Sequence, residues 1–374
     1  MAPPSPAPAS VAIATQPRRI ALLTSSRFWR GSSNVFAVVG RGLAARGHTA
    51  MALVAYDPLV DGFRARHVPV QQLPVGHTTL EGARALRAAL QRLRTDIVFV
   101  DRPRDIRLAV FASFRRPITV VYCISTPRPP RDLLTRLAFL RVALTVFLTE
   151  QLAQRAFAEA PFMRRAQHRV IPNGVDCDLY RPDEEAGRAF RRAHQLGDEP
   201  VLLGVGALEI EKRWDLLLDS LAILDSPVPP LLLCGTGALE SDLRAQAQRL
   251  NLDVRFVGHL DPLDLVAAYN AATCVVHTRP DEVFSLALIE ALACGRPVLA
   301  AGGGGGGTPE LLGDAGVLAP AENPGAFAGL LRDLLADPRR RAALGVAARQ
   351  RALERYSVER MVHEYADVVE ELAG

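Results

Sequence analysis

The segment DEVFSLALIEALACGRPVLA, residues 281–300, carries two carboxylates whose spacing suits the binding of a polar ligand. Ser285 is a good helix N-cap, so we expect a helix to begin there, with Glu290 inside it and Glu282 on the preceding loop. A carboxylate beside several free backbone N–H groups would suit a ligand that carries sugar hydroxyls and a diphosphate. The alternative is a solvated Glu282 and a surface Glu290. Yet Glu290 stands among leucine, isoleucine and alanine, where an unpartnered carboxylate is costly.

A single lysine marks a second position of interest. Of the 44 lysine and arginine side chains only Lys212 is a lysine, and it lies where a helix begins after the strand of GVGALEIEKR, residues 204–213. A compact ammonium and a planar guanidinium are not interchangeable, so a solitary lysine indicates a place that needs the ammonium. Chance is the alternative.

Glycines follow this strand and the next one along the chain. Gly206 lies in the segment of Lys212, and Gly235 and Gly237 lie in LLLCGTGALE, residues 231–240. Glycines at these positions let backbone N–H groups approach an anion where a helix starts. Ordinary strand-to-helix turns are the alternative at each of them.

A run of six glycines, residues 302–307, precedes Thr308, Pro309 and Glu310. Such a run orders poorly, because glycine loses the most backbone entropy on folding. It is therefore either low-complexity slack or a loop shaped to hold a ligand.

In the first half, Asp101 follows the apolar strand IVFV and is a candidate general base. A surface aspartate that caps the following turn is the alternative.

These side chains must be positioned by alternating strands and helices. The predicted strands are bare of charge or nearly so: IALLT (20–24), TAMALVA (49–55), IVFV (97–100), TVVYCI (119–124), VFLT (146–149), HRVIP (168–172), VLLGVGA (201–207), LLLCG (231–235), VRFVG (254–258), TCVVHT (273–278), PVLAA (297–301) and GVLA (316–319). Such strands, separated by helical patterns, indicate parallel sheets that are covered on both faces. The fold class is α/β, with two doubly wound, Rossmann-like parallel sheets, and ligands are expected in a cleft between them.

The chain has 374 residues, which favours two domains. We predict a disordered tail at 1–17, a first domain at 18–172, a linker at 173–187 and a second domain at 188–356. Helical periodicity continues to the end of the chain with a break near Tyr356 and Ser357, and the helix at 357–374 is expected to pack back on the first domain.

Charge divides unevenly between the two halves. Residues 1–182 carry 26 arginines against 11 acidic residues, and the rest carries 18 basic against 29 acidic residues. The arginine-rich half favours an anionic substrate or a peripheral contact with an anionic membrane surface, with a solvated basic face as the alternative. The apolar stretch from Leu133 to Leu148 is interrupted by Arg136 and Arg141, so it does not predict a membrane span.

Several other classes of protein are disfavoured. The five cysteines form no CxxC pair or zinc spacing, so no metal site is expected, and their use is typical of a reducing, cytoplasmic compartment. No strand-linked GxGxxG with a following acidic residue indicates a nicotinamide cofactor, and no nucleic acid is expected as a partner.

Together these segments resemble glycosyltransferase family 4, the glycogen-synthase-like group with the GT-B fold. Residues 281–300 resemble the EX7E motif of that family, IPNGVDCDLYRP (171–182) its interdomain connector, and the segment from Leu231 to Leu260 its second nucleotide-binding region. The similarity runs through most of residues 19–370. It implies a retaining transfer of a hexose from a UDP- or GDP-sugar to a glycan, lipid or small molecule, with no metal or cofactor. The first domain would then face the acceptor, and the second would bind the nucleotide sugar.

The resemblance also implies roles for individual residues. Glu282 would contact the donor sugar, Glu290 the ribose and Lys212 the phosphates. Glu282 and Lys212, with Asp101 as the candidate base, are the expected catalytic residues. The other expected donor-binding residues are Gly31, Gly206, Arg213, Gly235, Gly237, Arg255, Phe256, Val257, Val283, Phe284, Ser285, Leu286, Gly307, Thr308 and Glu310. Of the glycine run, 306–307 would belong to the functional turn and 302–305 would be a flexible extension.

The chain departs from the family pattern at two places. Ala207 stands where the family usually has an arginine, and Arg213 or Arg30 is a candidate substitute. Asp101 and Arg102 stand where the family often has a histidine near the acceptor. Two alternatives therefore stay open: another GT-B sugar-nucleotide enzyme such as an epimerase, and a catalytically silent scaffold or binding protein.

Overall fold

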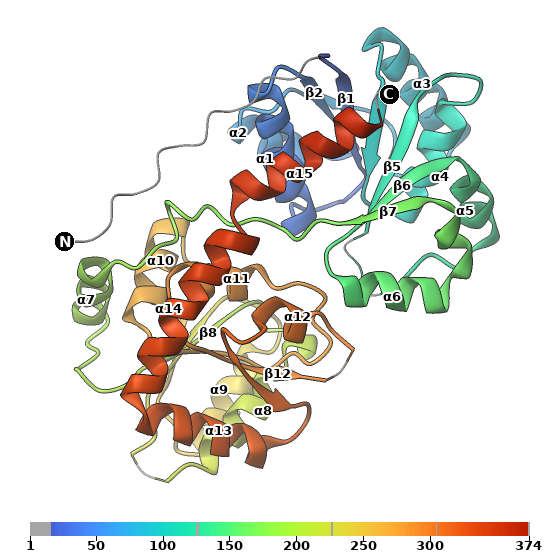
Figure 1. Cartoon of the computed structure of the whole chain (residues 1–374). Helices are drawn as coiled ribbons and strands as arrows, with labels where there is room; N and C mark the ends of the chain where they lie inside the picture. The colour runs from blue at the N-terminus through green and yellow to red at the C-terminus, as the bar shows by residue number, and fades with distance from the viewer. Residues whose placement is uncertain (1–15, 125, 127, 226, 304, 373–374) are drawn as a thin grey trace. The chain divides into compact units, whose positions relative to one another are not determined.

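The computed structural model describes residues 16–124, 126, 128–225, 227–303 and 305–372 (Figure 1). The chain forms two compact units. The first comprises Met1–Phe147, Ala156–Ile171 and Met361–Gly374, and the second comprises Leu148–Arg155 and Pro172–Arg360. Of the predicted tail at 1–17, only Gln16 and Pro17 lie within the described residues.

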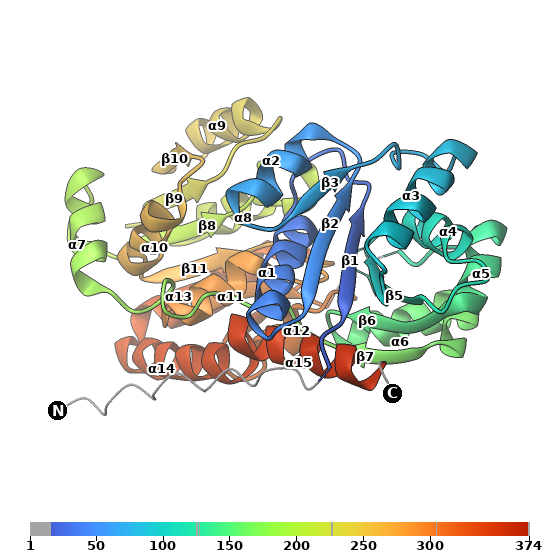
Figure 2. The same ribbon diagram turned by 90° about the horizontal axis from the view of Figure 1, so that it is seen from above.

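The first unit is built on a seven-stranded parallel sheet in the order β3-β2-β1-β4-β5-β6-β7 (Figure 2). Its strands are β1 (Arg19–Thr24), β2 (Thr49–Val54), β3 (Val70–Gln72), β4 (Ile97–Val100), β5 (Thr119–Ile124), β6 (Val142–Phe147) and β7 (Gln167–Val170). Its helices are α1 (Gly31–Ala45), α2 (Asp57–Ala65), α3 (Leu80–Arg92), α4 (Pro103–Ala112), α5 (Leu133–Ala138), η1 (Phe139–Arg141) and η2 (Pro161–Arg165). The boundary between the units falls within two further helices. Of α6 (Glu150–Glu159), the residues from Ala156 onward belong to the first unit, and of α15 (Val358–Glu371), the residues from Met361 onward do.

The C-terminal helix α15 packs beside α1, as Figure 1 shows. A Cβ on Gly42 of α1 would lie only 2.3 Å from Cγ1 of Val362, so the two helices approach closely at this glycine. Tyr365 of α15 makes an edge-to-face contact with Phe99 of β4, with ring centroids 5.8 Å apart. Helices α1, α2 and α15 thus share one apolar core with the sheet.

The second unit is a six-stranded parallel sheet in the order β10-β9-β8-β11-β12-β13. Its strands are β8 (Leu202–Val205), β9 (Leu231–Cys234), β10 (Val254–Gly258), β11 (Cys274–His277), β12 (Val298–Gly302) and β13 (Val317–Pro320). Its helices are α7 (Glu184–Ala193), η3 (Ile210–Lys212), α8 (Trp214–Ala222), α9 (Glu240–Arg249), α10 (Pro262–Ala271), α11 (Leu286–Ala293), α12 (Thr308–Leu312), α13 (Pro324–Ala336) and α14 (Pro338–Arg355).

Both faces of this second sheet are buried. Alternate residues of one strand enter different cores, since Leu203 packs with α10, α11 and α14 whereas Leu202 packs with α8, α9 and α13. The prediction of a doubly wound parallel sheet in each half is therefore confirmed.

The predicted strands differ from the structure at two places. β3 was missed, because its sequence VQQ is short and polar and lies at the edge of the sheet. β6 begins at Val142 instead of Val146, because periodicity cannot tell a buried strand from a helix in the apolar stretch 133–148.

The predicted linker at 173–187 also differs from the structure. Val175, Cys177 and Tyr180 are buried in the core of the second unit, and α7 begins at Glu184 with Asp183 as its N-cap. The polar residues of this stretch alternate with apolar ones that pack inward, so the chain here is part of the unit. Among the residues that the structure describes, no helix is long and apolar enough to cross a membrane.

Candidate active site

The loops that follow β8 and β11 meet at the topological switch point of the second sheet. After β8 the chain continues to β9 on one side, whereas β11 and β12 extend the sheet on the other side. The loops at the carboxyl ends of the two central strands therefore diverge, and such a point is where open α/β sheets bind ligands. Lys212 follows β8 and Glu282 follows β11.

Lys212 and Glu282 form an ion pair at this point. Nζ of Lys212 donates to Oε2 of Glu282 over 2.6 Å, and the two side chains are only 18% and 11% exposed. The hydroxyl of Thr278 donates to the carbonyl oxygen of Lys212 over 2.9 Å, which ties the two loops together. Two residues that were expected to be catalytic are thus brought into direct contact.

Two further side chains near Glu282 were not predicted: His277 ends β11, and Arg279 follows it in the loop. Nε2 of His277 lies 3.7 Å from Oε2 of Glu282, and Nη1 of Arg279 lies 3.9 Å from Oε1. Burial, with the charges of Lys212 and Arg279, lowers the pKa of His277 to about 3, so its imidazole is neutral. Nε of Arg279 also donates to Asp281 over 2.9 Å.

Their position in the sequence could have indicated both residues, because one ends a central strand and the other follows it directly in the next loop. Arg279 is of particular interest, since it brings a guanidinium to a site where Ala207 provides none. The candidate substitute Arg213 is held elsewhere: its guanidinium pairs with Asp215 and Glu322. Arg30 is exposed in the first unit.

The predicted start of α11 is confirmed. Ser285 is the N-cap, and its side chain accepts from the N–H of Leu288. Leu288, Ile289 and Leu292 are buried, which holds the helix against the sheet. The first N–H groups of a helix have no intrahelical acceptor, a geometry that favours an anion, and a role of Leu286 in donor binding stays a prediction.

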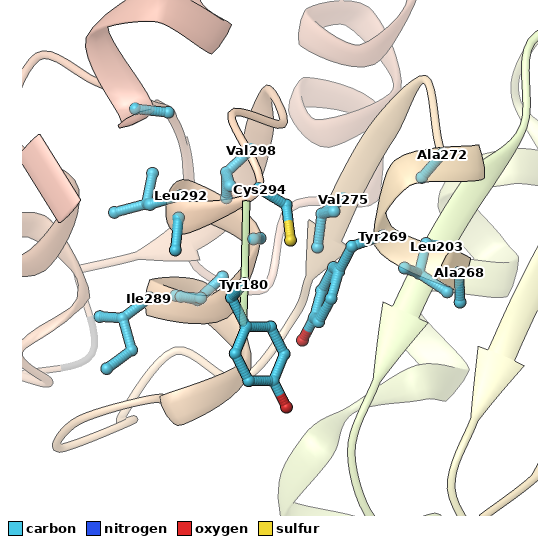
Figure 3. Close-up of a cluster of buried hydrophobic side chains, with 14 of the residues drawn as sticks. Tyr180, Leu203, Ala268, Tyr269, Ala272, Val275, Ile289, Leu292, Cys294 and Val298 are labelled. Carbon is cyan, nitrogen blue, oxygen red and sulfur yellow. The ribbon is translucent and has the colours of Figure 1, made fainter. Parts of the chain in front are cut away.

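Glu290 lies inside α11, half-buried beside two tyrosines. The hydroxyl of Tyr269 donates to Oε2 of Glu290 over 2.9 Å, and Tyr180 lies near enough to the carboxylate to lower its pKa. Figure 3 shows Tyr180 and Tyr269 beside each other in this cluster, and their ring centroids lie 6.2 Å apart. Burial raises the pKa of Glu290 to about 7, whereas the Tyr269 and Tyr180 hydroxyls lower it. The alternative of a solvated surface glutamate was therefore wrong.

The end of the glycine run packs against the loop of Glu282. The N–H of Gly307 donates to the carbonyl oxygen of Glu282 over 2.7 Å, and a Cβ on Gly307 would lie 2.4 Å from the carbonyl oxygen of Val283. A Cβ on Gly306 would lie 2.5 Å from the carbonyl oxygen of Glu282. Glycine is needed at both positions because two backbones approach closely there. Gly304 lies outside the described residues.

The residues after the run begin α12. Thr308 is buried, and its hydroxyl has no hydrogen-bond partner among the described residues. Glu310 uses both carboxylate oxygens to accept from the N–H groups of Glu150 and Gln151 at the start of α6. A role of Glu310 in donor binding stays a prediction, while its observed contacts stabilise a helix N-terminus.

Two of the predicted backbone donors already have acceptors. The N–H of Gly206 donates to the carbonyl oxygen of Cys234, and that of Gly235 donates to the carbonyl oxygen of Gly258. A Cβ on Gly237 would lie 2.4 Å from the carbonyl oxygen of Leu208, so this glycine also serves close packing of two loops. These glycines support the ordinary turn reading more than anion binding.

The predicted base-binding segment on β10 has contacts of its own. Arg255 pairs with Asp253 over 3.0 Å and donates to the carbonyl oxygen of His194. The guanidinium of Arg244 lies over the ring of Phe256, at 4.3 Å from its centroid. Phe284 of the EX7E segment packs edge-to-face on Tyr356. None of these contacts joins the Lys212–Glu282 pair, and a role of Arg255, Phe256 and Val257 in binding the base stays a prediction.

The remaining predicted residues lie in the first unit. Gly31 is the first residue of α1, and Asp101 follows β4. Asp101 is only 4% exposed, so the alternative of a surface aspartate was wrong. Asp105, one turn further along α4, is fully buried, and its Oδ2 accepts from the N–H of Ser25 over 3.1 Å. Burial raises the pKa of Asp101 above its usual range.

Two family descriptions match the chain. "Glycosyl transferases group 1" matches residues 188–351, and "Glycosyltransferase Family 4" matches residues 29–179. The GDP-mannose-dependent alpha-(1-6)-phosphatidylinositol monomannoside mannosyltransferase of Mycolicibacterium smegmatis is 34% identical over 200 residues, which are 50% of this chain and 52% of that protein. The D-inositol 3-phosphate glycosyltransferase of Xylanimonas cellulosilytica is 35% identical over 190 residues, or 48% of this chain and 46% of that protein. The chain spans about half the length of the curated relatives that it matches.

Solved structures resemble the whole chain. The Anabaena protein HepE in complex with UDP has a TM-score of 0.83 at 22% identity, covering 94% of this chain and 100% of that one. A glycosyltransferase from Rickettsia africae has a TM-score of 0.86 at 15% identity, covering 96% and 99%. At such identities the likeness shows the fold, which is the two-domain GT-B architecture. With the two family matches and the two parallel sheets, it follows that this protein belongs to family 4 of the GT-B glycosyltransferases.

Proposed function

We propose that this protein is a retaining glycosyltransferase that moves a hexose from a nucleotide diphosphate sugar to a glycan, lipid or small-molecule acceptor, with no metal or cofactor. The observation that carries the proposal is the Lys212–Glu282 ion pair at the switch point of the second sheet. The names of the relatives support a nucleotide-sugar donor, since one is GDP-mannose-dependent and the structure of another contains UDP.

In the proposed reaction, the bond between the anomeric carbon and the diphosphate oxygen breaks, a bond from that carbon to an acceptor hydroxyl oxygen forms, and the proton of that hydroxyl passes to an oxygen of the departing diphosphate. The departing nucleoside diphosphate gains negative charge, which the ammonium of Lys212 and the first N–H groups of α11 would stabilise. Glu282 would accept a hydrogen bond from a sugar hydroxyl. Before the donor binds, the ion pair compensates both charges in a largely buried site.

Arg279 adds to this arrangement. Its guanidinium lies beside Glu282, where a planar cation could form two hydrogen bonds to a phosphate. The neutral imidazole of His277 is a candidate donor to a sugar oxygen, because its Nε2 is directed at Glu282 and has no hydrogen-bond partner among the described residues.

The proposal predicts that the protein releases a nucleoside diphosphate from UDP- or GDP-sugars and that EDTA leaves the rate unchanged. The measurement is a donor screen with mass analysis of products, followed by NMR assignment of the anomer formed. An epimerase would convert the donor without an acceptor, and a silent scaffold would bind it without turnover. Absence of both binding and turnover with every sugar nucleotide would contradict the proposal.

A Tyr269→Phe variant tests the expected contact of Glu290 with the ribose. Removal of the hydroxyl deletes a hydrogen bond that lowers the pKa of Glu290, so this pKa is expected to rise above about 7. If the ionised carboxylate accepts from ribose hydroxyls, donor affinity strengthens as the pH rises through the pKa, and the variant moves this rise to higher pH. Calorimetric titration with UDP and GDP over a pH series measures it, and an unmoved profile would contradict the contact.

A further inference from the structure

The short helical segment 133–141 of the first unit, made of α5 and η1, turns an apolar face outward. Leu133, Leu134, Leu137 and Leu140 are 67%, 65%, 55% and 56% exposed. A fully apolar side chain that is half or more exposed is ordinary when it stands alone, but four within one short helix form a continuous patch. We call these four residues the leucine face.

The opposite side of the segment is fixed to the body of the unit. Thr135 is buried, its N–H donates to the N-cap Asp132, and its hydroxyl accepts from Arg107 of α4 over 2.8 Å. Phe139 is 1% exposed and packs edge-to-face on Tyr122 and Phe162. Since Thr135 and Phe139 are one turn apart, they hold one side of the helix inward. The leucines therefore cannot turn inward without breaking these contacts.

Arginines surround the leucine face. Arg136 and Arg141 are exposed, and within the described part of the chain neither has a carboxylate at salt-bridge distance. Arg131 stands before the helix and pairs with Glu159 over 2.6 Å. An outward row of leucines with unpaired arginines beside it is the pattern of helices that lie in the interface of an anionic bilayer.

Exposed apolar side chains are also found at the end of the neighbouring helix α4. α4 packs against α5, as Figure 2 shows. Its last turn carries Phe111, which is 55% exposed, and Phe114 just after the helix is 54% exposed. The guanidinium of Arg115 lies 5.5 Å from the centre of the Phe114 ring. Aromatic rings with arginine beside them favour the boundary between lipid headgroups and acyl chains.

From these observations we propose that the leucine face docks on the surface of an anionic lipid bilayer. The leucines enter the acyl boundary while Arg136 and Arg141 contact lipid phosphates. The positive charge favours an anionic bilayer over a protein partner. An apolar partner protein would not need the unpaired arginines, and a second copy of this chain would bring the same positive charges together. The excess of arginines over acidic residues in residues 1–182 adds an electrostatic attraction to an anionic surface that reaches beyond direct contacts. The inference does not rest on the proposed sugar transfer.

The test is co-sedimentation of the full chain with vesicles of phosphatidylcholine alone and with a phosphatidylcholine–phosphatidylglycerol mixture. We expect binding to the anionic vesicles only, weakened by salt. A variant with serine at all four leucine positions, and separately Arg136→Gln/Arg141→Gln, should each bind about tenfold or more weakly. Matched controls are Val346→Ser/Leu353→Ser and Arg339→Gln/Arg340→Gln, which change exposed apolar and basic residues of α14 and should bind as the wild type does.

A Leu137→Trp variant keeps the test decisive if the quadruple variant does not fold. Its added fluorescence should shift to the blue on anionic vesicles, since the indole would enter the apolar boundary. Equal binding of wild type and both face variants, equal binding to neutral vesicles, or a wild type that forms dimers which the leucine variant does not form would each overturn the inference. Nucleotide-sugar turnover without vesicles is measured in parallel, so that failure of docking and failure of the proposed transfer are distinguished.

Discussion

Replacing Lys212 by alanine is expected to lower kcat/KM for sugar transfer about 100- to 1,000-fold. The ammonium lies at the switch point of the second sheet, 2.6 Å from Glu282, where the charge of the leaving diphosphate would develop. Lys212→Arg should recover only part of this loss, because a planar guanidinium does not fit the same geometry. Steady-state kinetics with the donor found in the screen measure the effect.

Measuring the free energy of unfolding beside the activity distinguishes a catalytic role of Lys212 from a purely structural role of its ion pair. Lys212→Ala leaves the largely buried Glu282 carboxylate without its main partner, so the free energy of unfolding should fall by about 1–3 kcal/mol. The double variant Lys212→Met/Glu282→Gln should recover most of that stability and remain inactive. Arg339→Ala, an exposed cation on α14, is the control and should change neither quantity. If Lys212→Ala transfers sugar at the wild-type rate, or if the double variant regains activity, Lys212 has no part in the chemistry.

Replacing Asp105 by asparagine is expected to stabilise the protein at alkaline pH by about 2–5 kcal/mol. Asp105 is fully buried, and its Oδ1 has no hydrogen-bond partner among the described residues. Burial, with the charge of Asp101 as the second cause, raises the pKa of Asp105 from 3.8 to about 8. Asparagine keeps the shape and the acceptor for the N–H of Ser25 but has no proton to lose.

The direction with pH follows from the raised pKa. The folded state holds the Asp105 proton more tightly than the unfolded state, so the stabilisation is complete below a pH of about 4 and is lost as the pH rises through about 8. Urea unfolding over this range should show a steeper loss of stability for the wild type than for Asp105→Asn. Asp314 is an exposed carboxylate in the second unit, so Asp314→Asn should leave the dependence of the unfolding free energy on pH unchanged. If the free energy of unfolding falls with pH at the same slope in the wild type and in Asp105→Asn, the prediction is contradicted.

Much of the candidate site could be predicted because its residues lie at strand ends and because one motif spans it. The start of α11 at Leu286 follows from a local rule, since Ser285 caps the helix within four residues of sequence. The family resemblance placed Lys212 and Glu282 in one site although they are far apart in the chain, but the ion pair between them was not predicted. His277 and Arg279 were missed, although His277 ends the central strand β11 and Arg279 follows two residues later. No local pattern shows which side chain faces the partner loop.

The sequence by itself determined the alternation of buried strands and helices, and hence two parallel sheets, because an uncharged strand must be covered on both faces. It also determined where a helix could begin, where a lysine replaced an arginine, and that Glu290 stands among apolar neighbours. Only the tertiary structure decided that Tyr269 and Tyr180 surround Glu290 and that the N–H groups of Gly206 and Gly235 already have acceptors. It alone shows that the leucines of α5 face outward instead of filling the core. The physical reason is the same in each case: a contact depends on which elements the sheet order makes neighbours, and periodicity specifies a face without specifying what covers it.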